Sequence, residues 1–249
     1  MQNILLLIFT FVAYFVKAIT GFGNTLVMGS LFSFVIANRL TTPIDLIFSI
    51  PTNMYIVYKE RKNISFKIVI PLSVMLLVGS IPGTFLLKTG NERILKSGLG
   101  IVVIGLAIEM LMRTSAKETS MPAKKAANNP FFLVIIGVIS GVMAGLYGIG
   151  ALLVAYISRT TDNKNQFRAN ICCVFLVDNL FRVILYWFTG LLNKEIIFLA
   201  LLLSPGVILG MKLGLKVDAR IEEQTTKRIV IGLLMISGTI LFLKSFLNL

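Results

Sequence analysis

The stretch KAITGFGNTLV at residues 17–27 decides the fold, because it places two glycines inside an apolar run that otherwise favours a continuous helix. A similar stretch, AGLYGIGALLV, occupies residues 144–154. The paired glycines are Gly21 and Gly23 in the first stretch, and Gly148 and Gly150 in the second. Glycine adopts backbone conformations that other residues avoid. We therefore expect the helix to break at both places.

The composition indicates that both breaks lie in a membrane. Of the 249 residues, 56% are hydrophobic and 14% are charged, whereas about 25% are charged in a soluble domain. Several apolar runs approach the length of a membrane span, roughly 18 residues. The sequence thus predicts an all-α, polytopic integral membrane protein with about eight transmembrane segments. The net charge of +13 then reflects loops that set topology rather than nucleic-acid binding.

The two halves of the chain repeat the same features in the same order. Each glycine pair is followed by an asparagine in an apolar run and then by a Pro-Gly pair: Asn53 and Pro82-Gly83, then Asn179 and Pro205-Gly206. Such recurrence indicates an internal duplication. We expect a first transmembrane repeat at 1–112, a polar linker at 113–130 and a second repeat at 131–249.

The apolar segments on either side of the first break are short. Residues 4–16 and 24–37 would each form about 20 Å of helix, less than the roughly 30 Å of the hydrocarbon core. We therefore expect each repeat to open with a broken or re-entrant helix, followed by three spanning helices.

The basic residues predict the orientation. If each break reverses the chain inside the bilayer, sixteen lysines and arginines share one side and six lie on the other. The positive-inside rule favours this arrangement. It predicts inverted repeats in the plasma membrane, with both termini extracytoplasmic and the 113–130 linker cytoplasmic.

Helix ends inside a bilayer have unpaired backbone groups that must be satisfied, and a helix N-terminus attracts anions. The sequence thus predicts an anion site between the two breaks near mid-membrane, to which intramembrane polar side chains contribute. The predicted substrate-binding residues are Lys17, Gly21, Gly23, Asn24, Thr25, Asn53, Gly148, Gly150, Asn179 and Arg182. Two alternatives stay open: the glycines only allow close helix packing, and Lys17 extends to the interface.

Two acidic residues are predicted to support this site. Asp178 and Arg182 are four apart and share a helix face, so the carboxylate can hold the guanidinium for an oxyanion. A purely stabilising ion pair is the alternative. Glu109 could relay protons for coupled transport, or pair with Arg113 at the interface.

The sequence offers no catalytic constellation. It contains no histidine, and it lacks a P-loop, a nucleophile elbow and metal-ligand spacing. We expect neither an enzyme nor a bound metal or cofactor.

The chain resembles the TauE/SafE family of membrane transporters. The resemblance rests on the glycine-rich breaks, GFGNTLV and GLYGIGALLV, and on the Pro-Gly helices, SIPGTFLL and SPGVILGMKLG. It covers residues 4–247. The family implies transport of small sulfur-containing anions, such as sulfite or organosulfonates.

We therefore expect a secondary transporter, and an exporter in particular, that binds its anion at the breaks and works by alternating access. Its partners would be a small anionic substrate, the lipid bilayer and, if transport is ion-coupled, a proton or cation. The oligomeric state is left open. The alternatives are a non-transporting membrane scaffold or assembly protein, and an anion channel.

Overall fold

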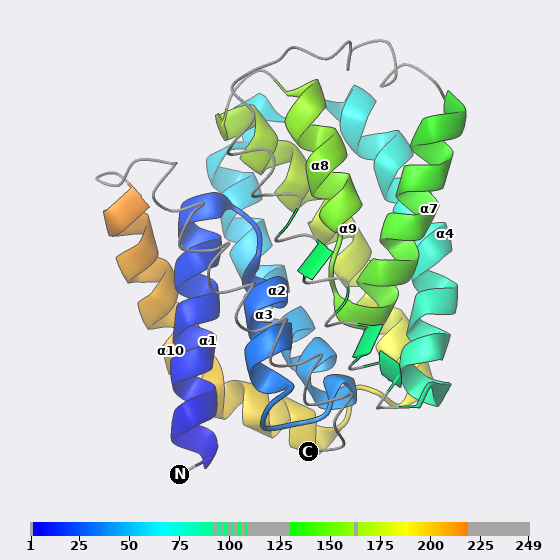
Figure 1. The fold of residues 1–249 in the computed structure, drawn as a ribbon. Coiled ribbons are helices and arrows are strands. Elements are labelled where there is room, and N and C mark those ends of the chain that lie inside the picture. Colours follow the sequence, from blue (N-terminus) through cyan, green and yellow to red (C-terminus); the bar gives the residue numbers. More distant parts are fainter. Residues whose placement is uncertain are drawn as a thin grey trace. The chain divides into compact units, whose positions relative to one another are not determined.

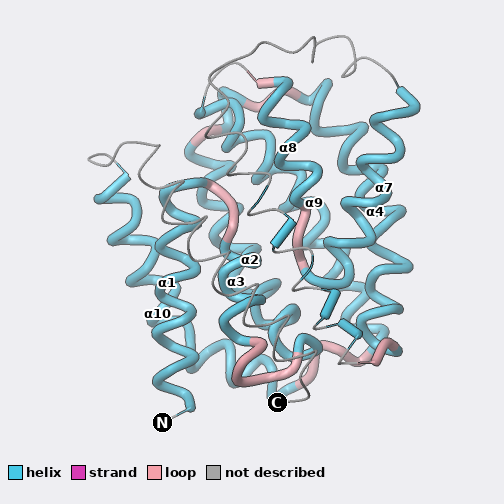
Figure 2. Tube along the Cα trace, viewed as in Figure 1, coloured by secondary structure: helices cyan, strands magenta, loops and turns pink. Residues whose placement is uncertain are grey.

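The computed structural model describes residues 2–91, 130–161 and 164–218, together with isolated helical positions between 94 and 108. All regular elements in these ranges are helical, with no strand among them (Figure 1), and the same ranges appear as helices and loops in Figure 2. The elements are α1 (Gln2–Thr20), α2 (Asn24–Phe32), α3 (Asn38–Lys59), η1 (Arg61–Asn63), α4 (Phe66–Thr89), α7 (Pro130–Tyr147), α8 (Ala151–Thr160), α9 (Lys164–Thr189) and α10 (Lys194–Asp218). The all-α class is confirmed, whereas the eight crossings and the inverted repeats stay predictions.

Membrane association is supported by the length and surface of these helices. Among the described helices, α1, α4, α9 and α10 each contain a stretch long and apolar enough to cross a bilayer. One face of α4 leaves large apolar side chains exposed at helical spacing: Phe66, Ile70, Val74, Val78, Ile81 and Phe85. A soluble monomer rarely exposes so continuous an apolar face. The face is therefore suited to lipid.

The chain divides into two compact units, each of which contains helices from both predicted repeats. Unit 1 consists of Met1–Asp45, Gly90–Thr119 and Glu195–Leu249, and unit 2 of Leu46–Thr89 and Ser120–Lys194. The described helices of unit 1 are α1, α2, the start of α3, and α10. Those of unit 2 are the rest of α3, then η1, α4, α7, α8 and α9. The compact units do not coincide with the predicted repeats at 1–112 and 131–249, which stay predictions.

In unit 1, a glycine face of α10 packs directly on the backbone of α1. Gly206, Gly210 and Gly214 recur at intervals of four. A Cβ at Gly210 would lie 2.5 Å from the carbonyl oxygen of Phe11, and one at Gly214 would lie 2.7 Å from that of Phe15. Small residues at this spacing allow two membrane helices to approach closely.

In unit 2, α4 and α7 meet through glycines on both helices. Gly79 faces Gly141 and Gly83 faces Gly145, whereas Gly137 of α7 lies against Met75 of α4. A Cβ at Gly141 would lie 2.3 Å from the carbonyl oxygen of Leu76. The Pro-Gly helix of each repeat thus packs by its glycines on a first-segment helix: α4 on α7, and α10 on α1.

Each break separates a first arm, the helix before the glycines, from a second arm, the helix after them, and the two arms differ in length. The 19 residues of α1 extend for about 28 Å, and α1 is long enough to cross a bilayer. The prediction that both arms are too short is therefore wrong for the first arm, because the helix continues from residue 2 to Thr20. The second arms are short: α2 has 9 residues and α8 has 10.

Candidate functional site

Both predicted helix breaks are present, and they begin with the same backbone geometry. α1 ends at Thr20 and α7 ends at Tyr147, one residue before the first glycine of each pair. Gly21 and Gly148 have positive φ angles of 85° and 74°. Their amides donate to the carbonyls of Lys17 and Ala144, at 2.7 Å and 2.8 Å. A left-handed glycine that bonds back in this way is a common helix terminator.

The second glycine of each pair serves a different purpose in the two breaks. Gly23 is left-handed, with φ of 88°, where α2 begins. Gly150 has φ of −109°, which any residue adopts, but a Cβ there would lie 2.5 Å from Cε1 of Phe175 in α9. The left-handed backbone conformation therefore requires glycine at position 23. At position 150, glycine is required by the close contact with the Phe175 ring.

Replacing Gly150 by alanine should destabilise the protein by about 1–2 kcal/mol, because the new methyl group overlaps the Phe175 ring. The variant Gly150→Ala/Phe175→Leu should recover most of this loss, because leucine lacks the ring atoms that the new methyl group would overlap. Thermal unfolding of the detergent-purified variants measures both effects. Equal losses in the single and double variants would show that Phe175 is not the obstacle.

The first break forms a helical hairpin in unit 1. Phe9 of α1 and Phe32 of α2 have ring centroids 6.5 Å apart, which requires α2 to run back along α1 (Figure 1). Thr20 satisfies part of the exposed backbone, because its hydroxyl donates to the Val16 carbonyl and accepts from the Phe22 amide. The hairpin thus brings the start of α2 alongside the last turns of α1.

A buried carboxylate joins this hairpin to α3. Asp45 accepts hydrogen bonds from the Tyr14 hydroxyl and the Asn24 side-chain amide, both at 2.8 Å, and from the Thr25 hydroxyl at 2.5 Å. Asn24 and Thr25, which the sequence predicts as anion donors, therefore both bond an anionic group of the chain itself. Asp45 is 4% exposed.

Lys17 lies within the same hairpin. Its side chain is 2% exposed, and its Nζ lies 5.6 Å from the centroid of the Tyr14 ring. The amine is held inside unit 1 and does not extend along the protein surface. Tyr14 therefore contacts both the Lys17 amine, through its ring, and the Asp45 carboxylate, through its hydroxyl.

At the second break, in unit 2, Arg182 has the partner that its spacing predicts. Its Nε lies 2.8 Å from Oδ2 of Asp178. Nη2 donates to Asn179 Oδ1 at 2.6 Å and Nη1 donates to the Ala144 carbonyl at 2.8 Å. Ser80 of α4 donates to the other oxygen of Asp178. Arg182 is 4% exposed, so its guanidinium is held by neighbours inside unit 2.

These contacts place a positive charge at the end of α7. Arg182 shares the Ala144 carbonyl with the Gly148 amide, and the Tyr186 hydroxyl donates to the next carbonyl, that of Gly145, at 3.2 Å. Cations at a helix C-terminus interact favourably with the helix dipole. α9 therefore caps the broken helix, and its arginine lies beside the break where an anion is predicted.

Several buried polar atoms of unit 2 have no hydrogen-bond partner within the described structure. They include Asn53 Oδ1, Ser73 Oγ, Thr84 Oγ1, Ser140 Oγ and Asn170 Nδ2. Thr84 lies near the second break, because a Cβ at Gly145 would be 2.8 Å from the Thr84 amide nitrogen. Unsatisfied buried groups are rare and call for an explanation. A ligand or a water molecule held in unit 2 would explain these unsatisfied atoms.

The structure groups the predicted site residues around the two breaks. Lys17, Gly21, Gly23, Asn24 and Thr25 surround the first, in unit 1. Gly148, Gly150, Asp178, Asn179 and Arg182 surround the second, in unit 2. Asn53 is buried in unit 2, whereas Glu109 and the 113–129 part of the linker lie outside the described residues. The prediction that both breaks hold one anion stays a prediction.

Sequence reasoning missed Asp45 and Tyr14. Asp45 is flanked by Ile44 and Leu46 in an apolar run, and an ionisable residue in such a run is itself a signal of function. Tyr14 gives no such signal, because an aromatic residue in an apolar helix usually serves packing alone.

Comparison with known proteins gives the same family by two routes. The model of the sulfite exporter TauE/SafE family matches residues 6–241. A relative in Cupriavidus necator, named "Probable sulfite/organosulfonate exporter TauE", is 23% identical over 190 residues, which cover 74% of this chain and 71% of that protein. No solved structure matches this chain.

Proposed function

Because the chain belongs to the sulfite exporter TauE/SafE family, we propose that it is a secondary transporter that exports small sulfur-containing anions, such as sulfite or organosulfonates. The observation that carries the proposal is Arg182, a buried guanidinium held at a helix break by Asp178 and Asn179. An intramembrane cation of this kind marks substrate paths. The name of the Cupriavidus necator relative supports the class of anion.

In the proposed cycle, an anion binds at the helix breaks and alternating access exposes it to each side of the membrane in turn. The sequence contains no nucleotide-binding motif, so we propose that the membrane potential drives export. An interior-negative potential expels one negative charge with about 2.3 kcal/mol per 100 mV. Asp178 and Glu109 are the proposed supporting residues if a proton or cation is coupled.

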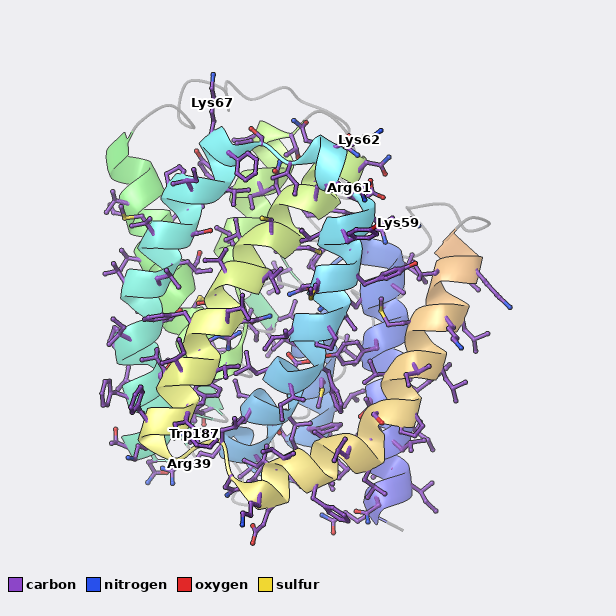
Figure 3. The ribbon with its side chains drawn as sticks, turned by 180° about the vertical axis from the view of Figure 1, so that it is seen from behind. Arg39, Lys59, Arg61, Lys62, Lys67 and Trp187 are labelled. Atoms are coloured by element: carbon purple, nitrogen blue, oxygen red, sulfur yellow. The ribbon has the colours of Figure 1, made fainter. Side chains whose placement is uncertain are left out.

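The distribution of basic residues supports the proposed orientation in the plasma membrane. Within unit 2, Lys59, Arg61, Lys62 and Lys67 gather at one end, and Trp187 lies at the other (Figure 3). Basic loops favour the cytoplasmic side, and tryptophan favours the interface. We propose that the 59–67 end is cytoplasmic, with the 113–130 linker on the same side and both termini outside.

A thermal-shift experiment on the detergent-purified protein tests the proposed substrate class. Sulfite and methanesulfonate should raise the unfolding temperature, since a ligand at 100 times its Kd stabilises the folded state by about 2.7 kcal/mol. Acetate serves as a control anion without sulfur. Stabilisation by neither sulfur anion would favour a scaffold protein. Binding without saturable counterflow would favour a channel.

A further inference from the structure

The Asp45 carboxylate in unit 1 lies where an oxyanion would be expected to bind. We propose that Asp45 is an internal occupant of the oxyanion site at the α1–α2 break, and that the sulfur anion displaces it. The inference rests on the proposed function and names a residue that competes with the ligand for its hydrogen-bond donors.

The donors around Asp45 form a cradle suited to an oxyanion. Tyr14 contributes a hydroxyl from α1, and Asn24 and Thr25 contribute an amide and a hydroxyl from α2. They reach both carboxylate oxygens, at 2.5–2.8 Å. A sulfite or sulfonate group has three oxygens that accept hydrogen bonds in the same manner. The cradle therefore recognises oxygens around a small central atom.

Charge prevents both anions from occupying the cradle together. Asp45 and Lys17 are 4% and 2% exposed, so water screens their charges little. A second negative charge within about 5 Å of the carboxylate would be repelled by roughly 3 kcal/mol at an effective dielectric constant near 20, which equals more than a hundredfold in affinity. The ligand must therefore displace the carboxylate or neutralise it.

A purely structural role for Asp45 makes the opposite prediction. If the carboxylate only ties the hairpin to α3, its removal loosens the hairpin and weakens any binding there. If it competes with the ligand, its neutral isostere no longer repels the anion and holds the donors less strongly, so binding becomes tighter. The direction of the change in affinity therefore separates the two roles.

The experiment measures methanesulfonate binding to the purified full chain by calorimetry, because this anion is fully ionised at neutral pH. In the D45N variant the Kd should fall about tenfold or more at neutral pH, since the charge that repels the anion is gone.

Two further variants keep the test decisive. Thr25→Val removes one donor without changing size, and its Kd should rise about tenfold. Ser30→Ala is the matched control on α2, because within the described part of the chain the Ser30 hydroxyl bonds only carbonyls of its own helix. Its Kd should be unchanged. Unchanged or weaker binding by folded D45N would overturn the inference. Absence of binding by the wild type would instead overturn the proposed function.

Discussion

The Arg182→Ala variant is expected to lose at least about 99% of anion flux in proteoliposomes. The substitution removes the cation beside the second break and leaves Asp178 buried without its 2.8 Å partner. The unpaired carboxylate then repels an arriving anion, and breaking a buried ion pair costs about 3–5 kcal/mol. Arg182→Lys keeps the charge but lacks the planar fork that bonds Asn179 and Ala144 together. We expect its flux to be reduced about tenfold.

A charge-balanced double variant separates binding from folding. Arg182→Ala/Asp178→Asn removes both charges, so no unpaired ion stays buried, and we expect thermal stability close to that of the wild type. Flux should still be absent, because the cation is missing. If the double variant transports at the wild-type rate, Arg182 is only a structural partner of Asp178. Tyr186→Phe is the control on α9: it removes one hydrogen bond to Gly145 and should leave flux within about twofold.

The second large effect is expected on stability, from alanine at Gly141. A Cβ there would lie 2.3 Å from the Leu76 carbonyl oxygen and 2.7 Å from Cα of Gly79. Both atoms belong to the backbone, so α4 and α7 must move apart to accept a single methyl group. We expect a loss of about 3 kcal/mol, which corresponds to roughly 10 °C in Tm for a chain of this length.

Two other glycine variants define the cause of this effect. Gly210→Ala in unit 1 should behave similarly, because its Cβ would lie 2.5 Å from the Phe11 carbonyl oxygen. Gly105→Ala should leave Tm unchanged or slightly raised, since its Cβ would have no atom within 4 Å and alanine favours helix. Equal melting of the Gly105 and Gly141 variants, by fluorescence-detected size exclusion, would contradict close packing of α4 on α7.

Local patterns in the sequence were sufficient to predict the breaks and one ion pair. Gly21 and Gly148 interrupt apolar helices, and the left-handed conformation that they adopt follows from their lack of a side chain. Asp178 and Arg182 share one helix face because they are four residues apart. Both features depend on a few neighbouring residues, so no knowledge of the tertiary structure was needed.

Features that depend on distant segments could not be predicted. Asp45 meets Tyr14 and Thr25 only because α2 folds back along α1 and the start of α3 brings the carboxylate to both. The helix that each glycine face meets, α7 for Gly79 and α1 for Gly210, is likewise a property of the tertiary structure. The apolar segment 4–16 predicts too short a helix because the charged Lys17 follows it, whereas α1 buries this residue and extends from Gln2 to Thr20.

The most direct test of the central claim is sulfite efflux from proteoliposomes while the membrane potential is set with a potassium gradient and valinomycin. The account predicts efflux that saturates with sulfite, accelerates when the interior is made negative, and disappears in Arg182→Ala. Efflux no faster than from protein-free liposomes at every potential would contradict it.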